Sequence, residues 1–388
     1  MARFLVHPRI SDIPATSWDA LTAGQPFMRH AYLAALEETG CVGEGSGWHP
    51  LHAALWEGDS LRAAMPLYLK QHSWGEYVFD WAWAEAFERH GIAYYPKALC
   101  AVPFAPVPGA RLLGADEDAR DLLAQVLAFC REQGLSSMHL LFPEARDLAL
   151  GESLGMQRRE GLQFHWHSAG ESDFEGFLAR LNHEKRKKIR QERRKLGEAG
   201  VSLRWLEGAA IAPEHWAFME RCYRTTYALH GSSPYLNLDF FLQLGAQLPE
   251  HCVLVLAERD SRPIAASLML RDATALYGRY WGAVEHVPGL HFEACYYQGI
   301  AYAIARGLHR FEGGAQGEHK LARGMEAVRT HSLHWIADRA FADAIGRYLE
   351  REREGVGAAI DELQERSPFK ATAPALSPTP PPPPPPEA

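Results

Sequence analysis

Alternating apolar and polar positions mark two similar segments of the chain. LWEGDSLRAAMPLYL (55–69) and LAERDSRPIAASLML (256–270) each alternate on both sides of a central Asp-Ser. This pattern predicts two antiparallel strands joined by a tight turn. The two segments align without a gap and are identical at seven of fifteen positions. They therefore predict a weak internal repeat built on a β-hairpin.

The patterns that follow each predicted hairpin also correspond. In the first half they predict strands over 77–83 and 99–104, a helix over 117–133, a strand over 136–142, a short helix over 144–154 and a strand over 162–167. In the second half they predict a strand over 275–283, a helix over 293–306 and strands over 308–312 and 331–336. Each half thus combines a hairpin with a helix and further strands, which predicts two α/β (α+β) units with mixed sheets flanked by helices. We expect the units to span residues 1–168 and 169–368.

A polar helix is predicted where the two halves meet. Residues 172–200 carry only a thin apolar stripe and end at two glycines. Within them, KRKKIRQERRK (185–195) holds eight basic side chains and one Glu. Such a run is commonly a solvated helix face. It lacks acidic partners four residues away, however, and Arg guanidinium groups match phosphate oxygens. The run therefore has two interpretations: a solvated helix face, or a site that binds a phosphate-bearing partner through Arg186 and Arg190.

Composition narrows the class of protein. The 388 residues are 47% hydrophobic and 11% aromatic, which suits two globular domains. The net charge of −8 argues against a DNA-binding or general nucleic-acid coat protein. Six scattered Cys lack metal-ligand spacing, so we expect reduced thiols and no metal site. The proline-rich residues 369–388 predict a disordered tail that tends to polyproline II.

The N-terminal residues lack the pattern of a signal peptide, and no apolar segment approaches the roughly 20 residues that span a bilayer. We therefore expect a cytoplasmic protein. Peripheral association with the inner membrane is the alternative location.

Polar side chains gather among aromatic residues in both halves. In the first half, the stretch 70–97 holds Lys70, His72, Glu76 and Asp80. In the second half, Tyr280 and Trp281 end a predicted strand, His291 and Glu293 begin the next helix, and Gln298 follows within two turns. Polar groups at strand ends and helix starts are typical of a ligand-binding cleft. Taken singly, each histidine is as well explained by a structural hydrogen bond.

The stretch GGAQGEHKLARG (313–324) is the most polar turn of the second half. Between its glycines lie Gln316, Glu318, His319, Lys320 and Arg323. Because it follows the strand predicted over 308–312, these groups should emerge at the strand's carboxyl end. If the segment is helical from Glu318, His319 and Arg323 share one face. The stretch is either a solvated loop or a wall of the cleft.

No nucleophile elbow, zinc-protease motif or Walker sequence is found in the chain. This favours direct acyl transfer to an amine, which needs a base and a hydrogen-bond donor for the carbonyl oxygen. Glu293 or His319 is the expected base, with Tyr280 and Gln298 positioning the substrate. The expected binding residues are Lys70, His72, Glu76, Asp80, Arg186, Arg190, Trp281, His291, Gln316, Glu318, Lys320 and Arg323.

Several segments resemble the FemAB-like group of N-acyltransferases in the same order. They include GWHPLHAAL, LNHEKRKKIRQERRKL, YGRYWGA, LHFEACYYQGI and EGGAQGEHKLARG, and the resemblance covers roughly residues 4–368. It implies two tandem domains of the GNAT (acyl-CoA N-acyltransferase) type. It also implies transfer of an acyl or aminoacyl group to an amine, with acyl-CoA, an acyl-carrier protein or aminoacyl-tRNA as donor. A sphingoid base is among the acceptors that the resemblance admits.

The chain departs from these families at two points. Better-studied Fem relatives carry a long coiled-coil arm, whereas the basic segment here is long enough for one helix only. The (Q/R)xxGx(G/A) turn of ordinary GNAT enzymes is missing, and VPGLHFE (287–293) is its expected replacement. The leading expectation is an N-acyltransferase that uses acyl-CoA or an acyl-carrier protein as cosubstrate. The alternatives are a tRNA-dependent aminoacyltransferase and a scaffold protein without catalysis.

Overall fold

Two long strands, β9 (Gln157–His167) and β15 (Glu326–Ile336), run antiparallel through the centre of the molecule and join its two halves. The computed structural model describes residues 2–314 and 317–370. Beyond its pairing with β9, the end of β15 pairs with β8 (Ser137–Leu141) in the first half. The end of β9 pairs with β14 (Arg310–Glu312) in the second half. One eleven-stranded mixed sheet therefore runs through both halves in the order β10-β11-β12-β13-β14-β9-β15-β8-β6-β5-β2.

Besides β9, the first half supplies four strands to this sheet, and it builds a smaller sheet beside it. The smaller sheet has the order β1-β3-β4-β7. The strands of this half, besides β8, are β1 (Arg3–His7), β2 (Trp48–Pro50), β3 (His52–Glu57), β4 (Ser60–Met65), β5 (Leu67–Lys70), β6 (Lys97–Cys100) and β7 (Leu113–Gly114). Its α-helices are α1 (Ala15–Asp19), α2 (His30–Glu38), α3 (Trp81–Arg89), α4 (Asp116–Glu132) and α5 (Ala145–Ser153).

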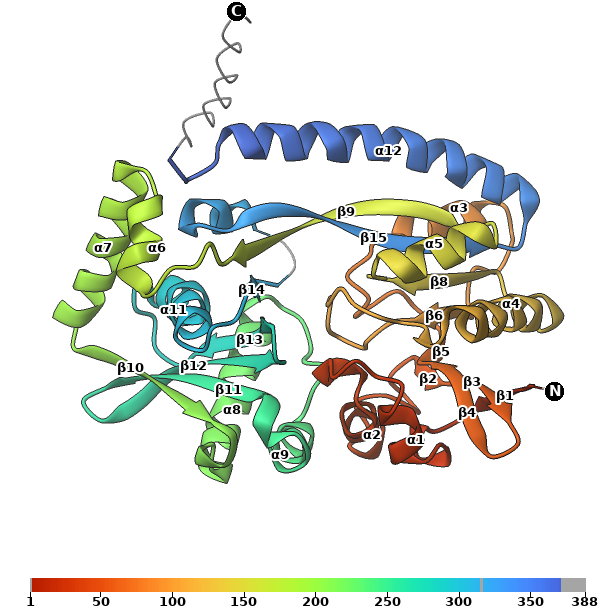
Figure 1. Cartoon of the computed structure of the whole chain (residues 1–388), viewed down its shortest axis with the longest axis horizontal. Coiled ribbons are helices and arrows are strands. Elements are labelled where there is room, and N and C mark those ends of the chain that lie inside the picture. The colour runs from red at the N-terminus through yellow and green to blue at the C-terminus, as the bar shows by residue number, and fades with distance from the viewer. Residues whose placement is uncertain (1, 315–316, 371–388) are drawn as a thin grey trace, which may run out of the picture.

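The second half begins with two helices that pack at one end of the sheet (Figure 1). These are α6 (Phe174–Arg180) and α7 (His183–Glu198). The strands that follow are β10 (Val201–Glu207), β11 (Cys252–Arg259), β12 (Arg262–Arg271) and β13 (Ala275–Ala283). The remaining helices are α8 (Pro213–Leu229), α9 (Leu238–Gln247), α10 (Leu290–Phe292), a π-helical segment (Glu293–Tyr297), α11 (Gln298–Ala305), a 3-10 helix (Glu318–Arg323) and α12 (Arg339–Glu365).

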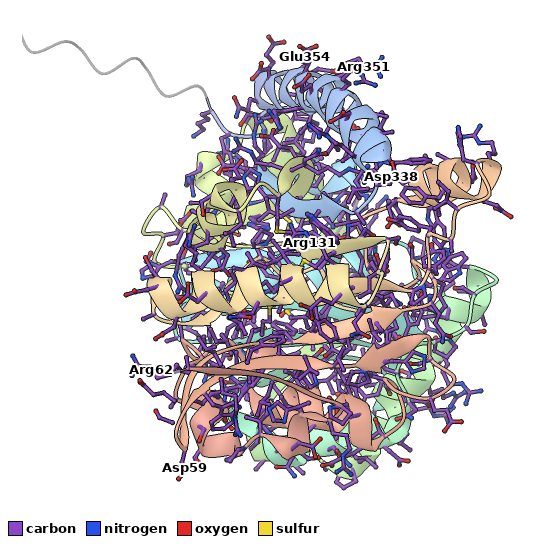
Figure 2. The ribbon with its side chains drawn as sticks, turned by 90° about the vertical axis from the view of Figure 1, so that its right-hand side faces the viewer. Asp59, Arg62, Arg131, Asp338, Arg351 and Glu354 are labelled. Carbon is purple, nitrogen blue, oxygen red and sulfur yellow. The ribbon has the colours of Figure 1, made fainter. Side chains whose placement is uncertain are left out.

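Helix α12 spans both halves above β9 and β15 (Figure 1). Near its start, Ile345 and Leu349 pack with Trp83 and Phe87 of α3 in the first half. Near its end, Leu363 belongs to the core of the second half. Its outer face carries charged side chains such as Arg351 and Glu354 (Figure 2). The amphipathic pattern of this helix was not among the sequence predictions.

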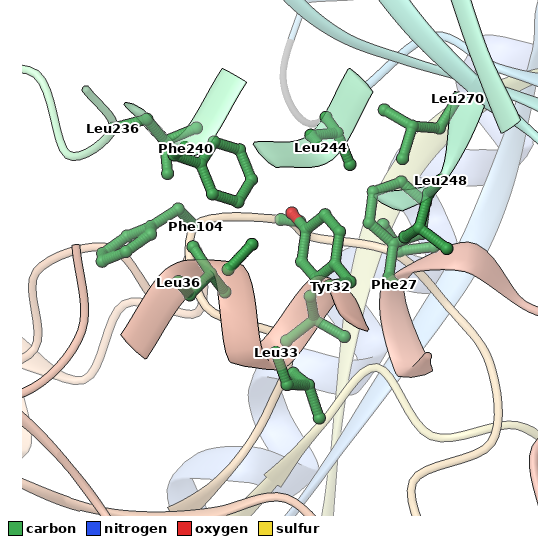
Figure 3. Close-up of a cluster of buried hydrophobic side chains, with 14 of the residues drawn as sticks. Phe27, Tyr32, Leu33, Leu36, Phe104, Leu236, Phe240, Leu244, Leu248 and Leu270 are labelled. Carbon is green, nitrogen blue, oxygen red and sulfur yellow. The ribbon is translucent and has the colours of Figure 1, made fainter. Parts of the chain in front are cut away.

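An apolar cluster joins the two halves on the other side of the sheet. Phe27, Tyr32 and Leu36, from the helical start of the chain, pack against Phe240 and other apolar residues of the α9 region (Figure 3). The ring centroids of Tyr32 and Phe240 are 5.7 Å apart and nearly perpendicular. Burying each such side chain contributes about 1.5–3 kcal/mol. The halves are therefore held together by a shared core as well as by the sheet.

Both predicted hairpins are confirmed, but the sequence alignment between them is out of register. The turns are Gly58–Asp59 in β3–β4 and Asp260–Ser261 in β11–β12, and a bulge follows each turn at the same distance. The matching turns are shifted by one residue relative to the gap-free alignment. Since a shift of one residue moves side chains to the opposite face of a sheet, the seven identities do not join equivalent positions.

The strand predicted over 275–283 is confirmed with the same bounds, as β13. Other predicted elements are confirmed with changed bounds: the helix at 117–133, the strands at 136–142, 162–167, 308–312 and 331–336, and the short helix at 144–154. The strand predicted over 99–104 is shorter and begins earlier, as β6. The helix predicted over 293–306 begins at Leu290 and contains the π-helical segment.

The strand predicted over 77–83 is wrong. Residues 77–80 form an irregular segment in which Tyr77 has a φ of 63°, and α3 begins at Trp81. The aromatic content of this stretch suggested a strand. Instead, Trp83 and Phe87 lie one helical turn apart and are buried together against α12. Tertiary packing therefore decides the local structure here.

The single helix predicted over 172–200 is also wrong, because it breaks between α6 and α7. Leu181 is extended and forms a β-bridge with Phe369. The amide of Asn182 donates to the Pro368 carbonyl at 2.9 Å, and the Asn182 side chain caps α7. The predicted disordered tail is therefore wrong for residues 369 and 370, which pair with this break. Residues 371–388 lie outside the described residues.

We expect one glycine of β13 to be required for the packing of α8. A Cβ added to Gly282 would lie 1.9 Å from the backbone carbonyl oxygen of Cys222. Gly282→Ala should therefore lower the free energy of unfolding by about 3 kcal/mol, the upper end of what overpacking costs. Gly355→Ala is the control, since that glycine lies in α12 with nothing within 4 Å of the added Cβ. It should raise stability by about 1 kcal/mol. Urea unfolding measures both, and equal midpoints for the two variants would contradict this account.

Candidate active site

A pocket of about 440 Å³ lies between the two halves, and we call it the central pocket. The first half lines it with Ser73, Trp74, Gly75, Tyr77, Phe79 and Trp81, which we call the wall segment. The second half lines it with Tyr235, Ser267, Gly278, Arg279, Tyr280, Trp281, His291, Cys295, Tyr296, Gly313, Gly314 and Lys320. The pocket therefore needs both halves.

The floor of the central pocket is the place where two parallel strands separate. β13 and β14 pair over three residues only, from Ala275–Arg310 to Tyr277–Glu312. Beyond this point Gly278 and Gly313 no longer pair with each other and line the pocket instead. β13 also carries a bulge at Arg279. A separating strand pair of this kind offers backbone groups to an extended ligand between the strands.

The corresponding place in the first half is filled by the chain itself. There β6 and β8 pair in parallel from Ala98–Met138 to Cys100–Leu140. Next to the pair, Gly109 forms a parallel bridge with Pro143. The fully buried Arg111 side chain donates to the Leu141 carbonyl at 3.0 Å and to the Val107 carbonyl. The two halves therefore differ at the one position where an extended ligand would fit between strands.

Two buried cations line the central pocket. The Lys320 Nζ donates to the Gly314 carbonyl at 3.0 Å, and burial together with nearby Arg279 lowers the pKa of Lys320 to about 8. Arg279 donates to the carboxylate of Glu312 at 3.3 Å. Burial raises the pKa of Glu312, an effect that the Arg279 charge opposes. Both cations can therefore stabilise negative charge on a ligand in a place with little water.

The side of the pocket near α10 carries aromatic and imidazole rings. His291 lies 5.3 Å from the ring of Trp281 and 5.4 Å from that of Tyr296. Burial lowers the pKa of His291 to about 4, so its ring is neutral near pH 7. Tyr280 is buried and lines the pocket as well. Tyr280, Trp281 and His291 are thus brought together, as the sequence suggested.

The predicted polar residues of the first half lie behind the wall segment. Lys70 is buried with its Nζ 3.9 Å from the centre of the Trp48 ring, and it donates to the Trp74 carbonyl at 3.2 Å. His72 contacts the Ser46 carbonyl at 3.1 Å. Glu76 and Asp80 both accept hydrogen bonds from the buried Lys97 Nζ. None of the four lines the central pocket.

Charges around Lys97 shift the pKa values of this cluster. Burial raises the pKa of Glu76 to about 7, although Lys97 opposes the shift. Burial lowers the pKa of Lys70 to about 7. Burial also disfavours ionised Asp80, but Lys97 and His139 together lower the pKa of Asp80 to about 2. The cluster therefore contains groups that titrate near neutral pH beside one carboxylate that stays ionised.

Glu293 pairs with the basic helix α7, and Gln298 hydrogen-bonds to Glu293; neither lines the central pocket. The Arg193 Nε donates to the Glu293 carboxylate at 3.1 Å, and Gln298 donates to it at 2.7 Å. The Gln298 carbonyl accepts from Trp205 at 2.8 Å. Glu293, Gln298 and Arg193 line a second pocket of about 530 Å³ together with Arg190 and Arg194. The expected base Glu293 is therefore held in an ion pair on the α7 side.

Several basic residues of α7 have acidic partners that the sequence did not indicate. Arg190 pairs with Glu175 of α6, and Arg193 pairs with Glu293. Arg194 pairs with Glu198, four residues along the same helix. The premise that the run lacks acidic partners four residues away is therefore wrong for Arg194, while Arg190 and Arg193 are paired with carboxylates more distant in the chain. Among the described residues, Arg186, Lys187, Lys188 and Lys195 have no carboxylate within 4 Å.

The residues of GGAQGEHKLARG divide between surface and interior. Glu318 and His319 are exposed, whereas Lys320 and Arg323 are buried. His319 contacts the Tyr296 hydroxyl at 3.1 Å, at the edge of the central pocket. Arg323 lies 3.6 Å from the centre of the Phe292 ring and donates to the His319 carbonyl at 2.9 Å. Because the segment is a 3-10 helix, the α-helical spacing expected for His319 and Arg323 is wrong. Gln316 lies outside the described residues.

Sequence reasoning missed Arg279 and Ser73, and it placed Lys97 at the end of the polar stretch 70–97 without giving it a role. Arg279 stands in an apolar strand, and only the bulge places it at the pocket. Ser73 and Lys97 carry no local signal, because Lys97 contacts residues 17 to 24 positions earlier in the chain. A lone Lys that opens a predicted buried strand is a weak signal that it has a carboxylate partner elsewhere.

We expect the thiols to be unreactive in the folded protein. Five of the six cysteines are buried, and Cys295, which lines the central pocket, is partly buried. Burial raises the pKa of Cys295 to about 12, so little thiolate forms at pH 8. Ellman's reagent should therefore modify all six thiols slowly in buffer and rapidly in guanidinium chloride. Fast modification of Cys295 in buffer would contradict the structure.

The fold and the sequence were compared with known proteins. The fold is similar to that of the C-terminal domain of a protein described as a lysylphosphatidylglycerol synthetase from Agrobacterium fabrum, at 11% identity and a TM-score of 0.54, over 86% of this chain and 95% of that one. It is similar to FemX at 10% identity and a TM-score of 0.53, over 89% of this chain and 100% of that one. These likenesses concern the fold alone, which is of the predicted class, with mixed sheets flanked by helices.

The sequence comparison identifies a family. Among curated proteins, none gives a significant match. Within the described residues, no helix combines the length and apolar character needed to cross a membrane.

Residues 9–371 match the profile of the FemAB-like family, whose description is peptidoglycan biosynthesis/recognition. Since that match covers nearly the whole chain, the protein belongs to the FemAB-like family.

Proposed function

We propose that the protein is an N-acyltransferase that moves an acyl group from a thioester donor, acyl-CoA or an acyl-carrier protein, to an amine. The observation that carries this proposal is the opening between β13 and β14 in the central pocket. An extended thioester arm fits between separating strands, where backbone groups are available along its length. The first half offers no such opening, since Arg111 and residues near Gly109 fill it.

Lys320 and Arg279 supply the electrostatic part of the reaction in this proposal. When an amine attacks a thioester, negative charge develops on the carbonyl oxygen. A buried cation aimed at that oxygen stabilises the transition state more than the substrate. Lys320 lines the pocket with its Nζ on the Gly314 carbonyl, which fixes its position at the strand opening. Arg279 is held by Glu312 and keeps the site positive.

The acceptor approaches from the wall segment. Trp74, Phe79 and Trp81 place apolar rings on that side of the pocket. An amine with an apolar portion, such as a sphingoid base or another lipid precursor of the cell envelope, suits such a wall. The family description supports an acceptor from the cell envelope. Glu293 and His319 remain the predicted bases, and variants of both should be tested together with variants of the pocket residues.

An aminoacyl-tRNA donor is a second candidate. The specific observation that favours it is the exposed row of Lys187 and Lys188 on α7, which with Arg186 has no carboxylate within 4 Å among the described residues. Unpaired cations of this kind bind phosphates. The short α7 supplies fewer such contacts than a long arm does.

We expect Lys320→Met to lower kcat/KM by about 10²–10³-fold, the loss typical of removing one donor to a developing oxyanion. The assay follows thiol release from palmitoyl-CoA with a sphingoid base as acceptor. Lys195→Met is the matched control, because Lys195 is exposed on α7 and should keep the wild-type rate. If Lys320→Met retains full activity, the role of Lys320 is wrong.

The tRNA alternative makes a different prediction. If the donor is aminoacyl-tRNA, the protein should copurify with RNA, which raises its absorbance at 260 nm relative to 280 nm. Replacing Arg186, Lys187 and Lys188 with Gln should then weaken tRNA binding and reduce the slope of its salt dependence by about 3. A protein free of RNA, with no tRNA binding at 50 mM salt, excludes this candidate.

A further inference from the structure

The proposed reaction releases one proton, and the central pocket holds no carboxylate among its described lining residues. When an alkylammonium acceptor attacks a thioester, the nitrogen–carbon bond forms and the carbon–sulfur bond breaks. The nitrogen loses two protons in all. The leaving thiolate takes one of them, and the other must reach a base. The inference below rests on the proposed function and concerns the path of that proton.

Among the described residues, one hydroxyl that lines the central pocket is linked by hydrogen bonds to buried carboxylates. Ser73 belongs to the wall segment, and its Oγ accepts from the Lys97 Nζ at 2.9 Å. The same Nζ donates to Glu76 Oε2 at 2.8 Å and to an Asp80 oxygen. Ser73, Glu76 and Lys97 are 3%, 4% and 0% exposed. Lys97 thus connects a hydroxyl in the pocket wall with two carboxylates that water does not reach.

The two carboxylates are not equivalent. Asp80 also accepts from the Tyr94 hydroxyl at 2.6 Å, and it stays ionised as the constant counter-charge of Lys97. Within the described part of the chain, Glu76 accepts from Lys97 alone, whereas Asp80 accepts from both Lys97 and Tyr94; the second oxygen of each carboxylate is buried without a hydrogen-bond partner. Because fewer donors stabilise its ionised form, Glu76 takes up a proton more readily, while Asp80 still balances the ammonium group.

We propose that Ser73, Lys97 and Glu76 form the path by which the acceptor amine loses its proton. Because an ammonium group has no lone pair, Lys97 first gives one of its protons to Glu76 Oε2. The neutral Lys97 Nζ then takes the hydroxyl proton of Ser73, as Ser73 Oγ takes the proton of the acceptor's ammonium group. The amine is then neutral, Ser73 and Lys97 have regained their starting forms, and Glu76 is protonated. Ser73 is the catalytic residue of this path, and Lys97 and Glu76 act through it.

The charges that face Glu76 suit this role. Besides Lys97 and Asp80, Glu76 is influenced by the charge of Lys70 from β5, and it in turn affects Tyr94 and Tyr95. Burial, as the largest cause, raises the pKa of Glu76 to about 7, which is the range in which a general base works best at neutral pH. His291 is a weaker base, because burial lowers its pKa to about 4.

The test is the pH dependence of kcat/KM for thiol release from palmitoyl-CoA with a sphingoid base. In the wild type, kcat/KM should rise with pH as a group with a pKa near 7 loses its proton. Glu76→Gln should lower kcat/KM at pH 7 by about 10²–10⁴-fold and abolish that rise. Ser73→Ala should also lower kcat/KM, because it interrupts the path at the pocket wall without leaving a buried charge.

Asp147→Asn is the matched control. Asp147 is a fully buried carboxylate whose pKa burial raises to about 6, but it accepts from the backbone amides of Arg111 and Leu112, away from the central pocket. The Asp147→Asn variant should be less stable than the wild type, and its kcat/KM should keep the pH dependence of the wild type. If Glu76→Gln does not fold, Ser73→Ala alone decides.

The outcomes separate the two hypotheses. A wild type that transfers no acyl group from CoA or an acyl-carrier protein overturns the proposed function and this path with it. An active wild type whose rate and pH dependence are unchanged in Glu76→Gln or Ser73→Ala overturns the path alone. A lower rate with an unchanged pH dependence assigns Glu76 to holding the wall segment and likewise overturns the path.

Discussion

The pairing of β9 with β15 is the constraint on which the rest of the structure depends. The two strands share nine register pairs, and each then continues into the sheet of one half. β9 comes from the first half of the chain but completes the sheet beside β14. β15 comes from the second half but completes the sheet beside β8. Each half is therefore closed by a strand of the other, and this ladder joins the two halves between which the central pocket lies. A reaction between two substrates depends on holding them in a defined arrangement.

The two halves use one architecture for different purposes. In both, a parallel strand pair follows an antiparallel hairpin, and a helix connects the paired strands. In the second half this pair opens at Gly278 and Gly313, and cations lie at the opening. In the first half Arg111 fills the corresponding place. The buried polar side chains of this half lie behind the wall segment, around Lys97. The fold thus provides two places for a ligand between strands, and the side chains leave only one of them open.

Sequence patterns predicted what depends on neighbouring residues. The hairpins, the amphipathic helix at 117–133 and the strands around it are set by local alternation and turn residues, so they could be predicted. The sequence alignment of the two hairpins is wrong by one residue. Residue types such as Asp and Ser are common at turns in any register, so their identity does not fix the alignment. The break at Leu181 could not be predicted, since it is made by Phe369 at the far end of the chain. Tyr280, Trp281, His291 and Lys320 were found because they cluster along the chain. Lys97 ends the polar stretch 70–97 but was given no role, because its partners lie 17 to 24 positions away along the chain.

The ion cluster behind the wall segment needs a reason to exist. Burying an ammonium group and two carboxylates costs several kcal/mol per ion before their attraction is counted, and an apolar replacement of equal volume is often as stable. If the cluster served only to hold residues 73–80 in place, apolar packing would do so at lower cost. Trp83 and Phe87 hold α3 in this way a few residues later. The buried charges adjoin the only stretch of the first half that lines the central pocket. Perturbed ionisable groups beside a cleft are typical of functional sites. The cost of the cluster is therefore more readily explained by chemistry at Ser73 than by stability.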